Sequence, residues 1–183
     1  VLFRSSVTVA NKAINSSTLA SYLSTYNAKI KNAYWYYQVL VRPETKVFKR
    51  DFYGMGTLKL SVLVDPSEKL NRKILITRSS GMKLFALGNM LRIISFSGVL
   101  EMEGKELNEF FREMETPAHD KWLPSRHSTN VPLAKEYNNE LKDWIRECVQ
   151  TLGEHSSDDE IEVAGLAGVL QKESDKTDQR GDD

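Results

Sequence analysis

The pattern that most constrains the fold lies in residues 72–85, where two short alternating apolar segments flank a glycine. Ile74 and Ile76 would face one way and their neighbours the other, which is the period of a half-buried β-strand. The alternation breaks at residues 78–81, where Gly81 can adopt a positive φ that bulkier residues resist. Apolar residues resume directly afterwards, so this stretch predicts a β-hairpin.

Two cations, Arg78 and Lys83, flank the turn of this hairpin. Together with the backbone N–H groups of Ser79, Ser80 and Gly81 they could hold an anion, because cations and unpaired N–H groups both attract negative charge. An ordinary solvated hairpin has the same residue types and is the commoner explanation of so short a motif. Both interpretations stay open on this pattern alone.

Two further strands are predicted by alternation at 58–64 and by a mainly apolar run at 91–102. Gly98 inside the second strand predicts a bulge or a close backbone contact. The aromatic run 33–42 fits a strand by propensity, but a helix that is buried on most sides fits it as well.

Helical spacing of apolar residues predicts three helices. They are expected near 19–30, at 104–115 and at 133–152, with Gly153 ending the last one. Because the strands precede the two strongest helices, we expect an α+β fold, with a three- or four-stranded, mostly antiparallel sheet covered on one face by amphipathic helices.

The expected domain spans residues 15–155 and comes after a short leading segment, 1–14. Charge separates the domain from the C-terminal segment, because residues 156–183 hold nine acidic and three basic residues and the rest of the chain carries a net charge of +6. An acidic, polar segment of this kind predicts a largely disordered tail, apart from a short apolar island at 161–170.

Two non-enzymatic functions are compatible with these features, nucleic-acid binding and protein–protein interaction. The basic body and the aromatic run at 34–37 could belong to a nucleic-acid-binding module, although its opposite charges alternate and do not by themselves imply nucleic acid. The apolar island could instead dock a partner protein. Both stay as alternatives.

No complete catalytic or metal-binding motif occurs in the sequence. His119 and Asp120 could be a base and its orienter, but neighbours in a loop rarely face each other, so a capping or hydrogen-bonding role is preferred. The acidic residues between 101 and 113 are better explained as a solvated edge than as metal ligands. The sequence therefore predicts no catalytic residue and no metal site.

The only cysteine, Cys148, lies on the apolar face of a predicted helix and is expected to be a small buried hydrophobe rather than a nucleophile. No apolar run approaches the ~20 residues that cross a bilayer. These features favour a reducing, cytoplasmic location without a membrane partner.

The first five residues, Val1 to Ser5, lack a start methionine and read as the translation of a common sequencing adapter. If they are artefactual, the chain is expected to be the C-terminal piece of a longer protein.

Four segments carry a resemblance to a known family. They are Phe52-Tyr53-Gly54-Met55-Gly56, Arg78-Ser79-Ser80-Gly81-Met82, Phe96-Ser97-Gly98-Val99 and Met114-Glu115-Thr116-Pro117-Ala118-His119-Asp120-Lys121-Trp122. In this order they resemble the region that comes after the nucleotide-binding domain in bacterial ATP-binding proteins of the gyrase, heat-shock chaperone, histidine kinase and MutL class, the GHKL ATPases. The resemblance covers roughly residues 30 to 170 and leaves the roles of His119, Asp120 and Trp122 unassigned.

The resemblance implies a transducer-like second domain whose partner is an N-terminal ATPase domain of the same parent protein. ATP and Mg²⁺ would be bound mainly by that domain, whose motifs this sequence lacks, so the fragment has no complete active site of its own. In several relatives a basic residue of the second domain reaches the γ-phosphate. Arg78 is the first candidate for this role and Lys83 the second, while homodimerisation stays open.

Overall fold

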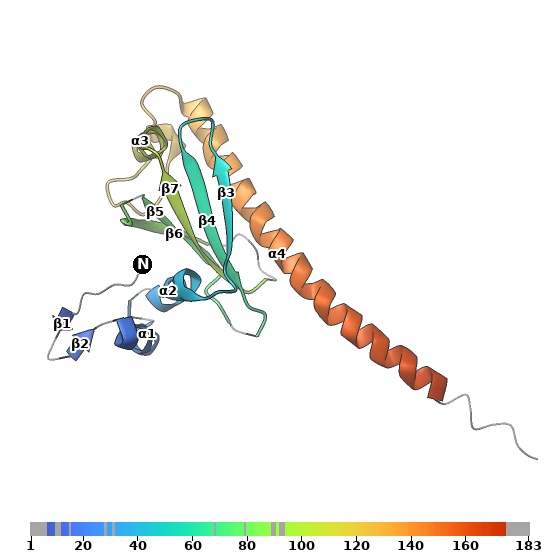
Figure 1. The fold of residues 1–183 in the computed structure, drawn as a ribbon. Coiled ribbons are helices and arrows are strands. Elements are labelled where there is room, and N and C mark those ends of the chain that lie inside the picture. The colour runs from blue at the N-terminus through green and yellow to red at the C-terminus, as the bar shows by residue number, and fades with distance from the viewer. Residues whose placement is uncertain are drawn as a thin grey trace, which may run out of the picture.

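The computed structural model describes residues 7–9, 12–14, 16–27, 29–30, 32–67, 69–78, 80–88, 91 and 94–174, and within these ranges it places side chains from Thr18 to Gly153. A five-stranded sheet lies at the centre of the fold, in the order β3-β4-β7-β5-β6 (Figure 1). Its strands are β3 (Lys46–Asp51), β4 (Thr57–Val64), β5 (Lys73–Arg78), β6 (Lys83–Leu87) and β7 (Phe96–Glu103). A separate pair, β1 (Val7–Val9) and β2 (Lys12–Ile14), precedes it.

The sheet is mixed, because β7 pairs antiparallel with β4 on one side and parallel with β5 on the other. The α+β class expected from the sequence is confirmed, but the sheet has five strands rather than three or four. The additional strand is β3, an edge strand whose residues are exposed or only partly buried. Three of its six residues are Lys46, Lys49 and Arg50, which hide the apolar alternation that marks the other strands.

Helices cover both faces of the sheet. They are α1 (Ser16–Thr25), α2 (Ala33–Val41), α3 (Lys105–Glu113) and α4 (Val131–Ser174), with a short 3₁₀ helix η1 (Pro124–Arg126) before α4. The larger core lies between the sheet and the pair α3 and α4, and it contains Leu60, Ile76 and Phe111, each with no exposed surface. The predicted alternation of Ile74 and Ile76 toward one face is confirmed.

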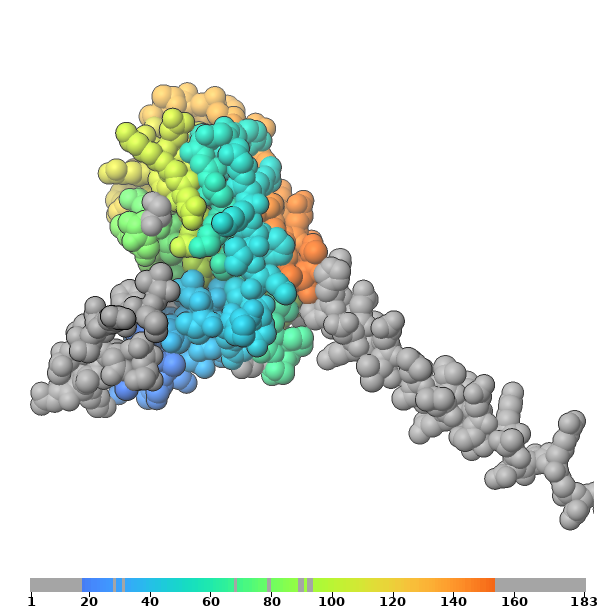
Figure 2. Space-filling view, in the orientation of Figure 1, coloured from blue at the N-terminus to red at the C-terminus, as the bar shows by residue number. Residues whose placement is uncertain are grey.

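The ambiguous aromatic run forms α2, which packs on the opposite face of the sheet. Tyr36 and Val39 lie against Leu63 and Val99 in a second, smaller core. The expectation that helices cover one face only is therefore wrong, because these two strands also present apolar residues on their other side. Figure 2 shows α2 over the lower part of this face, while β3 and β4 remain uncovered above it.

Gly98 makes a close contact rather than a bulge. The register of β7 against β4 runs unbroken from Phe96 to Glu103. A Cβ at Gly98 would lie 2.4 Å from Ile74 Cδ1 and 3.0 Å from the backbone oxygen of Ser61. A side chain there would press on both neighbouring strands.

Helix α4 contains the predicted helix 133–152 but continues to Ser174. The expectation that Gly153 ends this helix is wrong, because the helix continues to Ser174, whereas the expectation of a largely disordered tail at 156–183 stays a prediction. A Cβ at Gly153 would lie 2.2 Å from Ile94 Cδ1. This glycine therefore lies inside α4 and leaves space for the side chain of Ile94, which packs against the helix from outside. The side chains of the apolar island 161–170, and residues 175–183 entirely, lie outside the described part of the chain. Within that part, no helix is long and apolar enough to cross a membrane.

Cys148 is buried, as expected from its place on the apolar face of α4, and is 7% exposed. Burial raises the pKa of its thiol to about 11. At pH 8 we expect iodoacetamide to label the native chain more than about 100-fold more slowly than the unfolded chain, because only the thiolate reacts. Mass spectrometry of samples labelled with and without guanidinium chloride checks this. Similar labelling rates in the two samples would contradict the burial of Cys148.

Candidate functional site

The hairpin turn between β5 and β6 is closed by its own backbone. The Arg78 N–H donates to Met82 O at 3.0 Å, and the Gly81 N–H donates to Arg78 O at 2.8 Å. Gly81 has the expected positive φ, 77°. Its N–H is engaged within the turn, so the proposal that it could hold an anion is wrong. Ser80 is exposed, and Ser79 lies outside the described residues.

Arg78 and Lys83 lie on opposite faces of the sheet. Arg78 continues the row of Ile74 and Ile76, which faces α3 and α4. Lys83 is the cross-strand partner of Thr77, and such partners share a face, so it lies on the other side. The two predicted cations are therefore alternatives and cannot hold one anion together.

Arg78 is anchored by a buried carboxylate. Its Nη2 lies 2.7 Å from Oε1 and 2.6 Å from Oε2 of Glu115, whose side chain is only 4% exposed. The same Oε2 contacts His119 Nδ1 at 2.8 Å, and Arg126 Nε donates to the backbone oxygen of Glu115 at 2.9 Å. A buried carboxylate needs such partners, because desolvating it alone is costly. Glu115 thus connects three cationic or polar side chains, those of Arg78, His119 and Arg126.

His119 and Asp120 do not form the base-and-orienter pair that their adjacency suggested. His119 faces Glu115 and has a φ of 51°, which is uncommon for a residue with a side chain. Asp120 instead accepts a hydrogen bond from Thr116 Oγ1 at 2.6 Å, and this bond lowers the pKa of its carboxyl. The hydrogen-bonding role preferred for this loop agrees with these contacts. Trp122 is 6% exposed and packs between Phe85 and Phe111 in the larger core.

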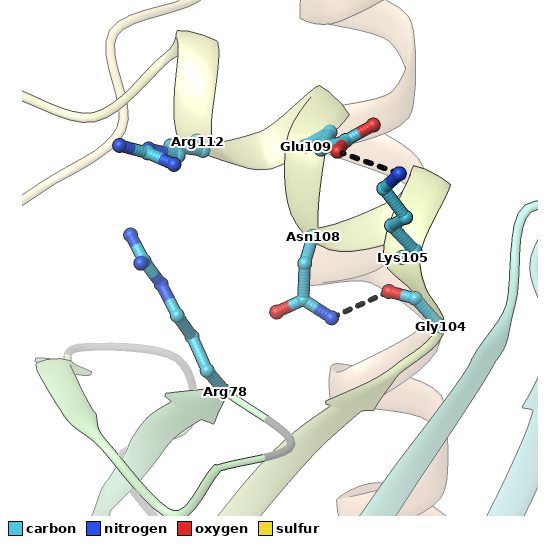
Figure 3. A pocket seen from close by; sticks show the side chains of 6 residues that line it. All are labelled: Arg78, Gly104, Lys105, Asn108, Glu109 and Arg112. Atoms are coloured by element: carbon cyan, nitrogen blue, oxygen red, sulfur yellow. Dashed lines mark hydrogen bonds and ion pairs between the residues drawn. The ribbon is translucent and has the colours of Figure 1, made fainter.

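A cavity of about 370 Å³ opens between the end of β5 and α3 (Figure 3). It is lined by Arg78, Gly104, Lys105, Asn108, Glu109 and Arg112. The guanidinium groups of Arg78 and Arg112 face each other across it, one from the strand and one from the helix. Lys105 Nζ lies 3.9 Å from Glu109 Oε1. Arg112 has no ion-pair partner among the residues that the structure describes. Three cations and one carboxylate line this cavity, and the Glu115 carboxylate lies against Arg78 just behind the lining, so the net charge of these five groups is +1 and Arg112 is the cation left unpaired by them.

Helix α3 brings its polar residues to the cavity through its own period. Lys105, Asn108 and Arg112 are spaced i, i+3 and i+7, so they share one side of the helix, while Leu107 and Phe111 on the other side are buried in the core. Gly104, with a φ of 124°, allows the sharp passage from β7 into this helix.

Asn108 has one satisfied and one unsatisfied end. Its Nδ2 donates to Met102 O and Gly104 O, both at 2.7 Å. Its Oδ1 is buried and has no hydrogen-bond partner within the described ranges. In Figure 3 this oxygen points away from Gly104, on the side of Arg78. A donor from a bound molecule could satisfy it only after a shift of the Asn108 side chain, because this oxygen has almost no exposed surface.

Of the residues proposed from the sequence, only Arg78 lines this cavity. Lys105, Asn108 and Arg112 were not singled out, because on the sequence alone they are the polar side of an ordinary amphipathic helix. Glu115 belongs to one of the four segments of the resemblance but was given no role. No group of three or more His, Cys, Asp or Glu side chains is placed to hold a metal ion in the part of the chain described here. No protein-family model, curated protein or solved structure matches this chain. The resemblance to GHKL proteins therefore rests on the four sequence segments alone and stays a prediction.

Proposed function

We propose that this chain is the transducer-like C-terminal part of a GHKL-type ATP-binding protein, in which Arg78 contacts the terminal phosphate of a nucleotide held by the N-terminal ATPase domain. ATP and Mg²⁺ belong to that domain, and no residue of this chain is given a role in holding the metal. The four sequence segments and the α+β fold support the proposal.

The observation that carries it is the placement of the Arg78 guanidinium. Glu115 holds this group through Nη2 alone, and Nε and Nη1 have no hydrogen-bond partner among the described residues. The group is therefore oriented at one nitrogen and still able to donate to an anion. A charge-assisted contact with phosphate contributes about 1.5–3 kcal/mol. Because it would form only with the triphosphate, it would couple the nucleotide state to the geometry of the two domains.

The test is Arg78→Ala in the full-length parent protein. We expect ATP turnover to fall roughly 10- to 100-fold, the loss that such a contact implies, with ADP affinity nearly unchanged. Steady-state phosphate release and ADP titration measure the two quantities.

Lys83→Ala is the matched control, because it removes one positive charge from the opposite face of the same hairpin. It should leave turnover unchanged. Normal turnover in Arg78→Ala would reject Arg78 as the contact. ATP hydrolysis by this chain alone would contradict the assignment of the active site to another domain.

The nucleic-acid alternative is not favoured by the placement of the aromatic run. Tyr36 is buried against the sheet, and Tyr34, Trp35 and Tyr37 are each partly buried, so none of these rings is fully exposed to bases. The alternative based on the 161–170 island concerns side chains outside the described part of the chain.

A further inference from the structure

We infer that the cavity between β5 and α3 is a binding site for a small phosphate-bearing anion in this chain by itself, and that Glu115 is a built-in competitor that lowers its affinity. Identifying the ligand as part of a nucleotide rests on the proposed function. The binding of a phosphate-bearing anion to this cavity is independent of that proposal.

The charges around the cavity indicate the class of ligand. Arg78 and Arg112 approach it from two elements, and planar guanidinium groups suit the oxygens of phosphate, which they can engage in pairs. Lys105 adds a third cation at the start of α3. An apolar ligand would leave Arg112 without a partner, while a chain of phosphates could contact all three cations. A volume of about 370 Å³ is in the usual range for small-molecule sites.

The amide oxygen of Asn108 would favour phosphate over sulfate. The amide group of Asn108 cannot be turned over to place its nitrogen here, because Nδ2 already donates to two backbone oxygens. An acceptor left buried on this side of the helix needs a donor, and a protonated phosphate oxygen supplies one at neutral pH. Sulfate carries no proton there. The site should therefore prefer phosphate to sulfate although their sizes are similar.

The carboxylate of Glu115 already accepts hydrogen bonds from Nη2 of the Arg78 guanidinium. A ligand that approaches Arg78 must share it with this carboxylate or draw it away. The carboxylate would not then be left alone, since His119 Nδ1 contacts its Oε2 and Arg126 holds the backbone of the same residue. Glu115 therefore opposes the ligand electrostatically and can release Arg78 without losing all its partners.

The experiment is calorimetric titration of inorganic tripolyphosphate, phosphate and sulfate into the 183-residue chain at low salt. We expect saturable binding of tripolyphosphate and tighter binding of phosphate than of sulfate. Arg112→Gln should weaken tripolyphosphate binding roughly tenfold, the effect of one charge-assisted contact. Lys83→Gln removes the same charge from the other face and should leave the affinity unchanged.

Arg112 and Lys83 are both exposed, and circular dichroism verifies that the two variants fold. Absence of binding, or equal weakening by the two variants, would overturn the site, because diffuse attraction to cations would then explain the data. Equal affinity for phosphate and sulfate would overturn the role of Asn108.

Glu115→Gln tests the competitor. Removal of its negative charge should tighten tripolyphosphate binding several-fold, and weaker binding by the folded variant would contradict this role. If this variant does not fold, the comparison of Arg112→Gln with Lys83→Gln still decides the site. Binding by the chain together with normal ATP turnover of Arg78→Ala in the parent would refute the nucleotide assignment only. Reduced turnover without tripolyphosphate binding would refute the cavity site only.

Discussion

Replacing Gly56 with alanine should destabilise the domain by about 3 kcal/mol or more, a large share of the 5–15 kcal/mol that is typical of folded proteins. A Cβ there would lie 2.2 Å from the backbone oxygen of Glu103 and 3.1 Å from Gly104 Cα. Neither atom belongs to a side chain that could rotate away, so the strand β7 or the bend itself must move. The adjacent Met55 O also accepts the Leu107 N–H at 3.2 Å, and the displacement would reach the start of α3.

Gly54→Ala is the matched control in the same bend. Gly54 has a φ of 70°, but a Cβ there would meet nothing within 4 Å. We expect a loss of only about 1–2 kcal/mol, which is the strain of a left-handed backbone. Urea denaturation followed by circular dichroism measures both values. Equal losses for the two variants would show that the contact between Gly56 and β7 does not limit stability.

Phe111→Ala should cost about 3–5 kcal/mol, the usual loss for a large side chain removed from a core. Phe111 has no exposed surface, and its ring centroid lies 4.6 Å from that of Trp122 and 6.0 Å from that of Phe52. The cavity left behind would lie beneath α3, whose other side carries Arg112. We therefore expect both a lower urea midpoint and weaker tripolyphosphate binding.

Phe110→Ala removes the same number of atoms from the neighbouring position. Phe110 is only partly buried, with its ring near those of His127 and Tyr137. Its loss should cost clearly less than that of Phe111. A larger loss at Phe110 would mean that α3 is held from the side of α4 rather than by the sheet.

The sequence predicted those elements whose burial leaves a regular pattern. The β5–β6 hairpin, strand β4 and helix α3 each alternate between apolar and polar residues at a single period. Strand β3 was missed because an edge strand has little to bury, and α2 stayed ambiguous because its run of aromatic residues suits either period. The position of β7 between β4 and β5 was not predictable, because pairing depends on contacts between segments far apart in the chain.

The candidate site was predicted only in part, for a similar reason. Arg78 was identified by its place beside a turn, which is a local feature. Arg112 belongs to a different element, and its spacing from Lys105 and Asn108 is the same as on any solvated helix side. Only the packing of Phe111 against the sheet turns that side toward Arg78.

The last strand of the sheet to be synthesised is β7, and it lies in the middle. The two hairpins β3–β4 and β5–β6 emerge from the ribosome first, but each alone is marginally stable, and only β7 joins them. Until residue 103 is available, the apolar sides of both hairpins have no common core to enter. We therefore expect this domain to fold late and in one cooperative step, and nascent chains that stop before β7 to be prone to aggregation.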